Sequence, residues 1–506
     1  MQKSPLTSQE MRVLELNANL LGISHSMLMQ NAGREVARIV AQKRSVEGKR
    51  VVILCGLGGN GGDGIVAARY LQEEGAIVEV YLLGSENDIS NRDTLLNWEI
   101  LKRFHDIKKD VLKTESSVKA CKSILEADVL IDAMMGFGLK SRVREPIVTA
   151  VKAFNKSSAM KFAVDVPTGI DSDTGAAHGL VAKSDFTIAL HAPKVGFKHA
   201  KEHVGKQVVV SIGIPAEALR LCGPGDLSLF NEPRRATAHK GEFGRILVVG
   251  GSDVYSGAPA LAGMAALRTG ADLVSVLVPE SVVAAVRSYS PNLMVSSLGT
   301  RILLQEAAEA VLDESNNQDV VALGPGLGMD LETISAVRTI AEKLGSFGKR
   351  MVVDADGLKA LAGSEIQFTA DNVVLTPHWG ELALLLEESL PESMETDDKI
   401  DKAVMASQKY NSVVLLKGPV DIVACPDGRY KLNRTGVPAM TVGGTGDVMT
   451  GIVAALLAQG KGAFFAAAAG AYVSGLAGEL AFQDLGNHIV PTDCIDRIPR
   501  AMLRAR

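Results

Sequence analysis

The stretch "RVVILCGLGGNGGDGIVAARYL", residues 50–71, contains the three parts of a strand–loop–helix unit. An apolar, β-branched run comes first, a glycine-rich loop follows, and a helical pattern then begins. Glycines at a helix start leave backbone N–H groups free to bind an anion such as a phosphate. The loop is not G-x-x-x-x-G-K-[ST], and a tight structural turn is the alternative interpretation. The stretch therefore predicts an α/β fold and suggests a nucleotide ligand.

The same alternation of apolar runs and helical patterns continues along the chain in two series. Strands of the first series are expected at 50–56, 76–84, 128–134, 161–167, 185–191 and 207–215. Strands of the second series are expected at 245–251, 272–279, 319–326, 350–357, 372–377 and 412–418. The segment between them, 216–244, contains Gly-Pro-Gly and Glu-Pro and no strand-like run, as expected of a connection. The pattern predicts two α/β domains, 1–222 and 223–506, each built on a parallel sheet.

Composition narrows the class of protein. The chain has 506 residues, of which 47% are hydrophobic, and a net charge of −5 without a basic run, so nucleic acid is not an expected partner. The first eleven residues lack an apolar run, which predicts no signal peptide. The apolar segment 463–478 is short and flanked by charges, so we expect a core helix and no membrane span. The five cysteines are far apart and form no CxxC pair: Cys55, Cys121, Cys222, Cys425 and Cys494. They predict reduced thiols in a cytoplasm and no zinc site.

Polar residues follow three expected strands of the first domain. Asn60 and Asp63 lie in the glycine loop, Asp132 ends the next apolar strand, and Asp165 ends another, with Thr168 just beyond it. Ligands of open α/β sheets bind beyond the carboxyl ends of the strands, so these side chains should converge on one crevice. The oxygens of Asn60, Asp132 and Thr168 suit a hard cation. Each acid alone has a second interpretation as a capping residue.

Four motifs in this order carry a family resemblance: "LMQNAGREVA" (28–37), "GGNGGDG" (58–64), "DAMMGFGL" (132–139) and "VDVPTGIDSDTG" (164–175). Together they resemble the NAD(P)H-hydrate epimerase domain, over about residues 5–215. The resemblance implies a Rossmann-like three-layer sandwich, a potassium ion, and epimerisation at C6 of the hydrated cofactors NADHX and NADPHX. Thr168 stands where many members are expected to have serine, and both residues offer a hydroxyl.

The resemblance also implies site residues in the first domain. Its potassium ligands fall on Asn60, Asp132 and Thr168, and its catalytic carboxylate falls on Asp165, which we expect to shuttle a proton. Its substrate-binding positions are Gly59, Asn60, Gly61, Gly62, Asp63, Gly64, Gly136, Phe137, Gly138, Leu139, Lys140, Ser141, Arg142 and Asp165.

The second half contains another glycine loop before an apolar helical segment, "VGGTGDVMTG" at 442–451, with Asp447 inside the expected anion site. It is preceded by "GPGLG" (324–328), "VVDADGL" (352–358), "LTPHWGELALLL" (375–386) and "LLKGPVDIV" (415–423). This series resembles the ADP/ATP-dependent NAD(P)H-hydrate dehydratases, over about residues 228–506. The resemblance implies a ribokinase-like three-layer sandwich.

Phosphoryl transfer explains an acid inside an anion site. The loop N–H groups bind the phosphate, while Asp447 acts as the base on the neighbouring acceptor hydroxyl. The resemblance implies hydrate contacts at Ala258, Gly328, His378 and Asp447. It implies nucleotide contacts at Lys417, Gly418, Pro419, Val420, Asp421 and Gly446. His378 has an alternative role as a helix cap, and Asp354 and Asp356 either assist magnesium or cap a helix.

The sequence thus predicts a bifunctional repair enzyme that epimerises R- and S-NAD(P)HX and dehydrates the S form. The expected cofactors are K⁺ and Mg²⁺, with ADP favoured over ATP as phosphoryl donor. We expect a cytoplasmic homo-oligomer that binds neither nucleic acid nor membrane. The alternatives are a ribokinase-type small-molecule kinase fused to a nucleotide-binding domain, and a non-enzymatic scaffold.

Overall fold

The computed structural model describes residues 4–138, 141–391 and 394–505. The chain divides into two compact units, Met1–Ala218 (unit 1) and Leu219–Arg506 (unit 2), and the division falls inside the short helix α9 (Glu217–Arg220). The division lies close to the domain boundary expected after residue 222.

Unit 1 contains one parallel seven-stranded sheet in the order β3-β2-β1-β4-β5-β6-β7. Its strands are β1 (Arg50–Cys55), β2 (Ile77–Leu83), β3 (Lys108–Leu112), β4 (Val129–Ala133), β5 (Met160–Val164), β6 (Phe186–Leu190) and β7 (Lys206–Val210). Its helices are α1 (Ser8–Leu20), α2 (His25–Lys43), α3 (Gly59–Glu73), α4 (Arg92–Leu101), α5 (Glu115–Ala120), α6 (Ser123–Glu126), α7 (Ile147–Lys156) and α8 (Lys201–Val204). The order reverses between β1 and β4, which is where ligands bind in this kind of sheet.

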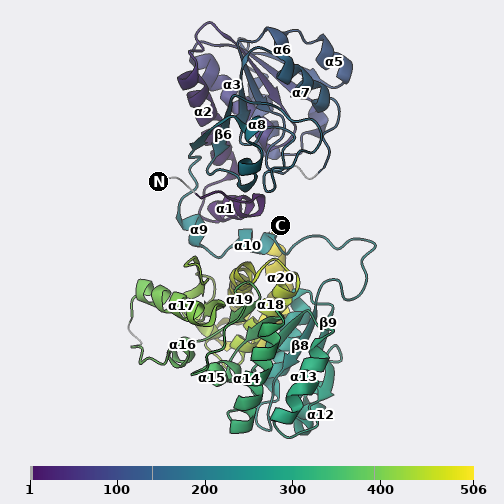
Figure 1. Ribbon diagram of the computed structural model, residues 1–506, viewed down its shortest axis with the longest axis vertical. Helices are drawn as coiled ribbons and strands as arrows, with labels where there is room; N and C mark the ends of the chain where they lie inside the picture. Colours follow the sequence, from purple (N-terminus) through teal and green to yellow (C-terminus); the bar gives the residue numbers. More distant parts are fainter. Residues whose placement is uncertain (1–3, 139–140, 392–393, 506) are drawn as a thin grey trace. The chain divides into compact units, whose positions relative to one another are not determined.

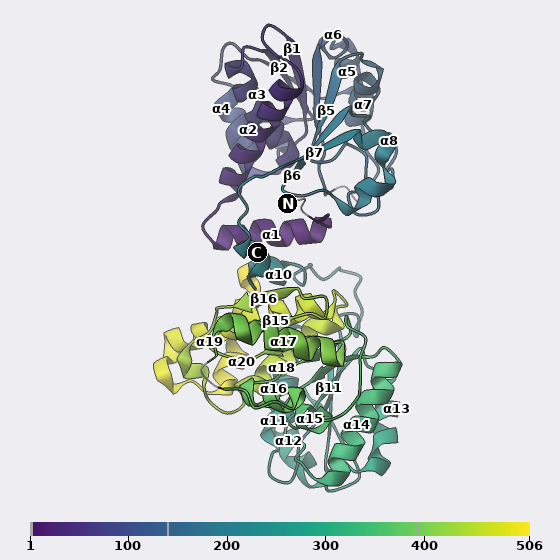
Figure 2. The same ribbon diagram turned by 60° about the vertical axis from the view of Figure 1, so that its left-hand side comes forward.

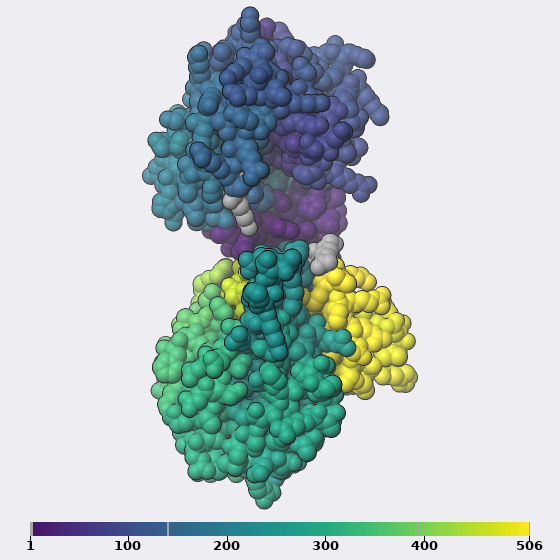
Figure 3. Space-filling view, turned by 90° about the vertical axis from the view of Figure 1, so that its right-hand side faces the viewer, coloured from purple at the N-terminus to yellow at the C-terminus, as the bar shows by residue number. Residues whose placement is uncertain are grey.

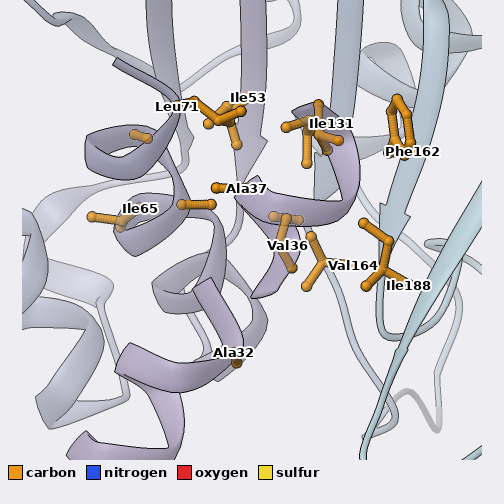
Figure 4. Packing of buried hydrophobic residues seen from close by; sticks show 14 of the residues in the cluster. Ala32, Val36, Ala37, Ile53, Ile65, Leu71, Ile131, Phe162, Val164 and Ile188 are labelled. Carbon is orange, nitrogen blue, oxygen red and sulfur yellow. The ribbon is translucent and has the colours of Figure 1, made fainter. Parts of the chain in front are cut away.

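Helices cover both faces of this sheet, with α2, α3 and α4 on one side and α5 and α7 on the other (Figures 1 and 2). The alternation within β1 follows from this: Val51 and Ile53 face the α2–α3 side, while Val52 and Leu54 face the other. Figure 4 shows the first of these cores, in which helix residues pack on strand residues: Ala32, Val36, Ala37, Ile65 and Leu71 against Ile53, Ile131, Phe162, Val164 and Ile188.

Unit 2 contains a nine-stranded sheet in the order β10-β9-β8-β11-β12-β13-β14-β15-β16. Its strands are β8 (Arg245–Val249), β9 (Leu273–Val278), β10 (Met294–Ser297), β11 (Val320–Leu323), β12 (Arg350–Val353), β13 (Val373–Leu375), β14 (Val413–Leu416), β15 (Asp421–Ala424) and β16 (Tyr430–Asn433). The last two pairings, β14–β15 and β15–β16, are antiparallel, and the others are parallel. The strand order reverses between β8 and β11.

The helices of unit 2 also form two layers. One layer contains α11 (Gly257–Thr269), α18 (Thr445–Ala458), α19 (Ala463–Leu485) and α20 (Pro491–Met502). The other contains α13 (Ala308–Ser315), α14 (Leu331–Ser346), α15 (Asp356–Leu361), α16 (Trp379–Leu386) and α17 (Thr396–Tyr410). The short helices α10 (Pro224–Ser228) and α12 (Val283–Tyr289) complete the unit. Figure 3 shows the chain's last segment, in yellow, on the surface beside the teal residues that begin this unit.

Among the described residues one helical segment, Ala463–His488, is long and apolar enough to cross a membrane, and 89% of its most apolar window is buried inside the structure. It corresponds to α19, which packs against α18 and α20. The core helix expected at 463–478 is therefore present, and it is longer than the apolar segment.

Twelve expected strands are present, and four others, β3, β10, β15 and β16, were not predicted. β3 and β10 are edge strands, and all but one residue of each is exposed or half-buried, so neither forms the apolar run by which the other strands were predicted. The hairpin β15–β16 begins at Asp421, the last residue of the segment expected to contact the nucleotide. The connection at 216–244 is likewise not wholly irregular, since it contains α9 and α10.

Gly451 gives a test of the packing between α11 and α18. A Cβ on Gly451 would lie 2.0 Å from the carbonyl oxygen of Ala262, so the two helices approach too closely for any side chain. Alanine is the better helix former by about 1 kcal/mol, but overpacking costs about 1–3 kcal/mol, and we expect the clash to win. Gly451→Ala should lower the free energy of unfolding of unit 2 in a denaturant titration. Gly257→Ala, where a Cβ meets nothing within 4 Å, is the matched control and should not destabilise; equal stability of both variants would contradict the argument.

Candidate active sites

The first candidate site is a cavity of about 560 Å³ in unit 1, at the carboxyl ends of β1, β4 and β5. Its lining includes Gly59, Asn60 and Asp63 from the glycine loop, Gly136, Phe137 and Gly138 from the loop after β4, and Asp165. The parallel register explains the convergence, because Leu54 pairs with Asp132 and Asp132 with Ala163, which brings the ends of the three strands to one edge.

Several predicted substrate residues do not reach this cavity surface. Gly61, Gly62 and Gly64 are buried in α3 and make close packing possible: a Cβ on Gly61 would lie 2.0 Å from the Gly56 carbonyl oxygen. Ser141 and Arg142 are exposed and do not line the cavity. Leu139 and Lys140 lie outside the described residues.

Asp132 and Thr168 form one buried network. The Thr168 hydroxyl donates to Oδ1 of Asp132 at 2.7 Å, the Thr168 N–H donates to Oδ2 at 2.8 Å, and the Met134 N–H donates to Oδ1 at 3.2 Å. Burial raises the pKa of Asp132 to about 6, against the lowering effect of these hydrogen bonds. A buried carboxyl in this state would be stabilised in its ionised form by a cation.

Asn60 gives evidence for a cation site that does not depend on Asp132. Within the described residues, Nδ2 of Asn60 is buried and has no hydrogen-bond partner. An amide group can be placed either way round in such a site, and an oxygen here would need a donor or a cation. The carboxylate of Asp132, the hydroxyl of Thr168 and the unsatisfied amide of Asn60 offer oxygens of the kind that a hard cation such as potassium binds.

Asp165 is held differently from Asp132. It adopts a positive φ of 59°, and its Oδ1 accepts from the Leu190 N–H at 3.0 Å and from Nζ of Lys194 at 2.6 Å. The Lys194 side chain is fully buried. Asp132 lies on β4, and Asp165 follows the neighbouring strand β5. The two acids have separate partners, because Thr168 binds Asp132 and Lys194 binds Asp165.

Lys194 and Glu15 are residues of this site that sequence reasoning missed. Glu15 lies on α1 and lines the cavity, far in sequence from every motif. The available signal was the apolar pattern of α1, in which Met11, Leu14 and Ala18 are buried and place Glu15 beside the buried stripe.

The second candidate site lies in unit 2, where the segments after β8, β11, β12, β13 and β14 meet the start of α18. Asp354 follows β12 and accepts from Nζ of Lys417 and from the Thr450 hydroxyl, both at 2.7 Å. Nζ of Lys417 lies 3.4 Å from where a Cβ on Gly446 would be. Burial opposes the charge of Lys417, but Asp354 and Glu381 outweigh it and hold its pKa above the usual value.

Asp447 stands in the first turn of α18, after Gly444, which caps the helix with φ of 98°. Among the described residues its carboxylate has no hydrogen-bond partner. Burial raises the pKa of Asp447 to about 7, and the nearby Asp354 adds to the shift while Lys417 opposes it. An unpartnered carboxyl with a pKa near neutrality, beside a lysine and a helix start, suits a general base close to a bound phosphate.

The other predicted residues of unit 2 are placed as follows. Gly328 donates its N–H to Asp356 at 2.9 Å, and Ala258 lies beside Gly326 near the start of α11. His378 is exposed and caps α16, its Nδ1 accepting from the Gly380 and Glu381 N–H groups.

The segment predicted to contact nucleotide is exposed at Gly418 and Pro419 and half-buried at Val420. The Asp421 side chain points into the fold instead: it accepts from the Gly418 N–H at 3.0 Å and from Asn433 at 2.9 Å. Its carboxylate therefore shapes the loop and is not free for a ligand.

The carboxylates of Asp354 and Asp356 are already engaged by donors of the protein itself. Each carboxylate already has both oxygens bonded: Asp354 to Lys417 and Thr450, Asp356 to Gly328 and Lys359. The described residues contain no group of three His, Cys, Asp or Glu side chains arranged to hold a metal ion.

Two α/β units, each with a carboxylate at its strand-end site, are the arrangement expected of a two-site enzyme. Residues 246–500 match the family model described as NAD(P)H-hydrate dehydratase, and residues 25–196 match the one described as YjeF-related protein N-terminus. The chain is 41% identical over 504 residues to the bifunctional NAD(P)H-hydrate repair enzyme Nnr of Pyrobaculum aerophilum, covering 99% of this chain and 98% of that protein. It is 41% identical over 500 residues to the enzyme of the same name from Hyperthermus butylicus, covering 98% and 92%.

Unit 2 also resembles a solved structure, the ADP/ATP-dependent NAD(P)H-hydrate dehydratase of Bacillus subtilis co-crystallised with ATP/Mg²⁺. The TM-score is 0.50 at 27% identity, and the match covers 57% of this chain and 99% of that one. The chain belongs to the family of bifunctional NAD(P)H-hydrate repair enzymes, with an epimerase domain followed by a ribokinase-like dehydratase domain. This confirms the predicted fold and family and does not support the small-molecule kinase or the scaffold.

The pKa of Asp447 leads to a pH prediction for dehydration. A base must be ionised, and the ionised fraction of Asp447 falls as the pH drops through about 7. We expect kcat/KM for dehydration of the S hydrate to fall about tenfold per pH unit below that value. The measurement is the initial rate of reduced-cofactor formation between acid and neutral pH, which gives the acid limb of the pH profile. The residual activity of Asp447→Asn should lack it, and an unchanged limb in that variant would assign the titration to another group.

Proposed function

We propose that the cavity of unit 1 interconverts the R and S hydrates and that the site around Asp447 converts the S hydrate to NADH or NADPH. The observation that carries the proposal is that each unit has its own carboxylate at its own strand-end site. In unit 1 this is Asp165, which lines the cavity, and in unit 2 it is Asp447, whose carboxylate has no hydrogen-bond partner among the described residues. The substrates are then NADHX and NADPHX, and the product of the first site is the substrate of the second.

The dehydratase steps follow from the residues of unit 2. Asp447 accepts the proton of the C6 hydroxyl, and the C6 oxygen forms a bond to the terminal phosphorus of the nucleotide while the bond to the departing nucleotide oxygen breaks. Lys417 and the free N–H groups at the start of α18 stabilise the negative charge on the phosphates. The ring nitrogen then expels the C6 phosphate, and loss of a ring proton restores the reduced nicotinamide. Gly418, Pro419 and Val420 are proposed to contact the nucleotide, and Ala258, Gly328 and His378 the hydrate.

Magnesium is proposed to enter as the complex of the nucleotide, whose phosphates are its usual ligands in such sites. The engagement of Asp354 and Asp356 with protein donors supports this over a resident ion. ADP is the proposed donor. Homo-oligomer formation and a cytoplasmic location stay predictions, the latter supported by five cysteines that are all unpaired.

The decisive experiment supplies each purified epimer of NADHX to the protein with ADP or with ATP. We expect free phosphate and reduced cofactor in equal amounts from the S form, and from the R form only after epimerisation. Accumulation of a stable phosphorylated product would instead favour the kinase. Faster turnover with ATP than with ADP would reverse the donor preference.

Asp447→Asn tests the base in unit 2. Asparagine keeps the shape of the side chain and cannot accept the proton, so dehydration should fall by roughly 10²-fold or more while epimerisation stays near wild type. The two activities are followed separately, by absorbance of the reduced cofactor and by chromatography of the epimers. Dehydration at the wild-type rate would show that Asp447 is not the base.

In unit 1, Asn60, Asp132 and Thr168 are proposed to hold potassium, whose positive charge would stabilise the ionised form of Asp132. Asp165 is proposed to act on the substrate. Its ion pair with Lys194, separate from the Asp132–Thr168 network, supports this division.

The division predicts different responses of two variants to potassium. Asp132→Asn keeps an oxygen ligand but loses the charge, so its epimerisation should be partly restored by high potassium. Asp165→Asn should lose activity by about 10²–10⁴-fold, and potassium should not restore it. The measurement is R-to-S interconversion against potassium concentration, with sodium as the control for ionic strength. Rescue of both variants, or of neither, would contradict the assignment.

A further inference from the structure

The cavity of unit 1 is lined by more acidic side chains than there are basic side chains in contact with them. Four carboxyl groups line it: Glu15 of α1, Asp63 of α3, Asp93 of α4 and Asp165 after β5. Lys194 is the cation in contact with this group. Neither lysine nor arginine is found among the described residues that line the cavity itself.

Lys194 cannot serve a second carboxyl. An ammonium group has three N–H donors. Those of Lys194 are taken by Oδ1 of Asp165 at 2.6 Å and by the carbonyl oxygens of Leu190 and Ala192, both at 3.1 Å. Asp165 is therefore the carboxylate that is neutralised, and Glu15 and Asp63 share no direct bond with the ammonium.

The pKa values of Glu15 and Asp63 are accordingly raised above those of free carboxyl groups. Burial raises the pKa of Glu15 to about 7, and Asp165 adds to the shift while Lys194 and Arg12 oppose it. Burial, then Asp165 and Glu15, hold the pKa of Asp63 well above its usual value. The other titratable side chains that line the cavity are His25 and Asp93.

Of these two carboxyls, Glu15 is the one that can reach a ligand. Asp63 is buried, whereas Glu15 is half-buried and turns part of its surface to the cavity. Within the described residues, the Glu15 carboxyl has no hydrogen-bond partner. It sits on α1, and Glu15 and Asp165 line the same cavity.

We propose that Glu15 is a catalytic residue of the epimerase site, the general acid that works opposite Asp165; this rests on the epimerase function proposed for unit 1. Glu15 donates its proton to the C6 hydroxyl, the C–O bond breaks with its electron pair leaving as water, and the ring-nitrogen lone pair forms a C=N bond. Water adds to the other face of C6, returns the electron pair to nitrogen, and gives its proton to Asp165. Atoms and charge balance, and the return reaction starts from ionised Glu15 and protonated Asp165.

Glu15→Gln tests this role. We expect kcat for R-to-S interconversion to fall about 10²–10⁴-fold, with dehydration of the S hydrate unchanged. Because the acid must be protonated, kcat/KM of the wild type should decline as the pH rises above about 7, and the variant should lack this alkaline limb. Glu15→Asp keeps a carboxyl and should recover part of the rate. Glu73→Gln, at the exposed end of α3, is the matched control and should behave as wild type.

The outcomes separate the proposals. Interconversion by Glu15→Gln within about threefold of wild type would overturn the role of Glu15, and so would an alkaline limb that persists in the variant. Thermal unfolding establishes that the variant is folded. If Glu15→Gln is not folded, the role of Glu15 is tested by the rate of Glu15→Asp and by the pH profile of the wild type. A wild type without the alkaline limb overturns the proposal. A wild-type protein that fails to epimerise at all would overturn the proposed function itself, whereas an epimerising wild type with an active Glu15→Gln overturns only the inference about Glu15.

Discussion

Parallel strand pairing is the constraint on which both sites depend. In each sheet the central strands run in the same direction, so the segments that follow them leave from one edge. The register Leu54–Asp132 and Asp132–Ala163 brings the glycine loop, Asp132 and Asp165 to the same place in unit 1. In unit 2 the adjacent strands β12 and β13, then β14, deliver Asp354, His378 and Lys417 in the same way. Helices on both faces bury the strands, and the strand ends are left for chemistry.

Both sites also contain a buried ion pair, Lys194–Asp165 in one and Lys417–Asp354 in the other. Removing two charges from water is costly, and such pairs add little net stability compared with apolar residues of the same size. Their value here is positional. Each pair fixes a lysine or a carboxylate at a known point next to a second acid, and that second acid, Glu15 or Asp447, has a pKa raised to about 7.

The sequence allowed the parallel strands, the strand-end acids and the family to be predicted, because these depend on local pattern and motif. It did not lead to a prediction of β15 and β16, because "LLKGPVDIV" was assigned to a family motif and no strand was expected after residue 418. Lys194 and Glu15 were missed for a different reason. Each stands alone in sequence, and only the folded chain brings it to Asp165. Asp421 shows the reverse case, where a motif residue uses its side chain inside the fold.

The helix α1 has a consequence for how the protein is made. Leu6, just before it, bonds through its backbone to Pro193 and Val195, and the cavity that Glu15 lines is closed by residues as late as Ile212. The ribosome releases α1 first and Ile212 nearly two hundred residues later. During that interval the first helix has no docking partner from β6 and the segment after it. The epimerase cavity therefore forms late in synthesis, when almost all of unit 1 has emerged, and an incomplete nascent chain cannot carry it.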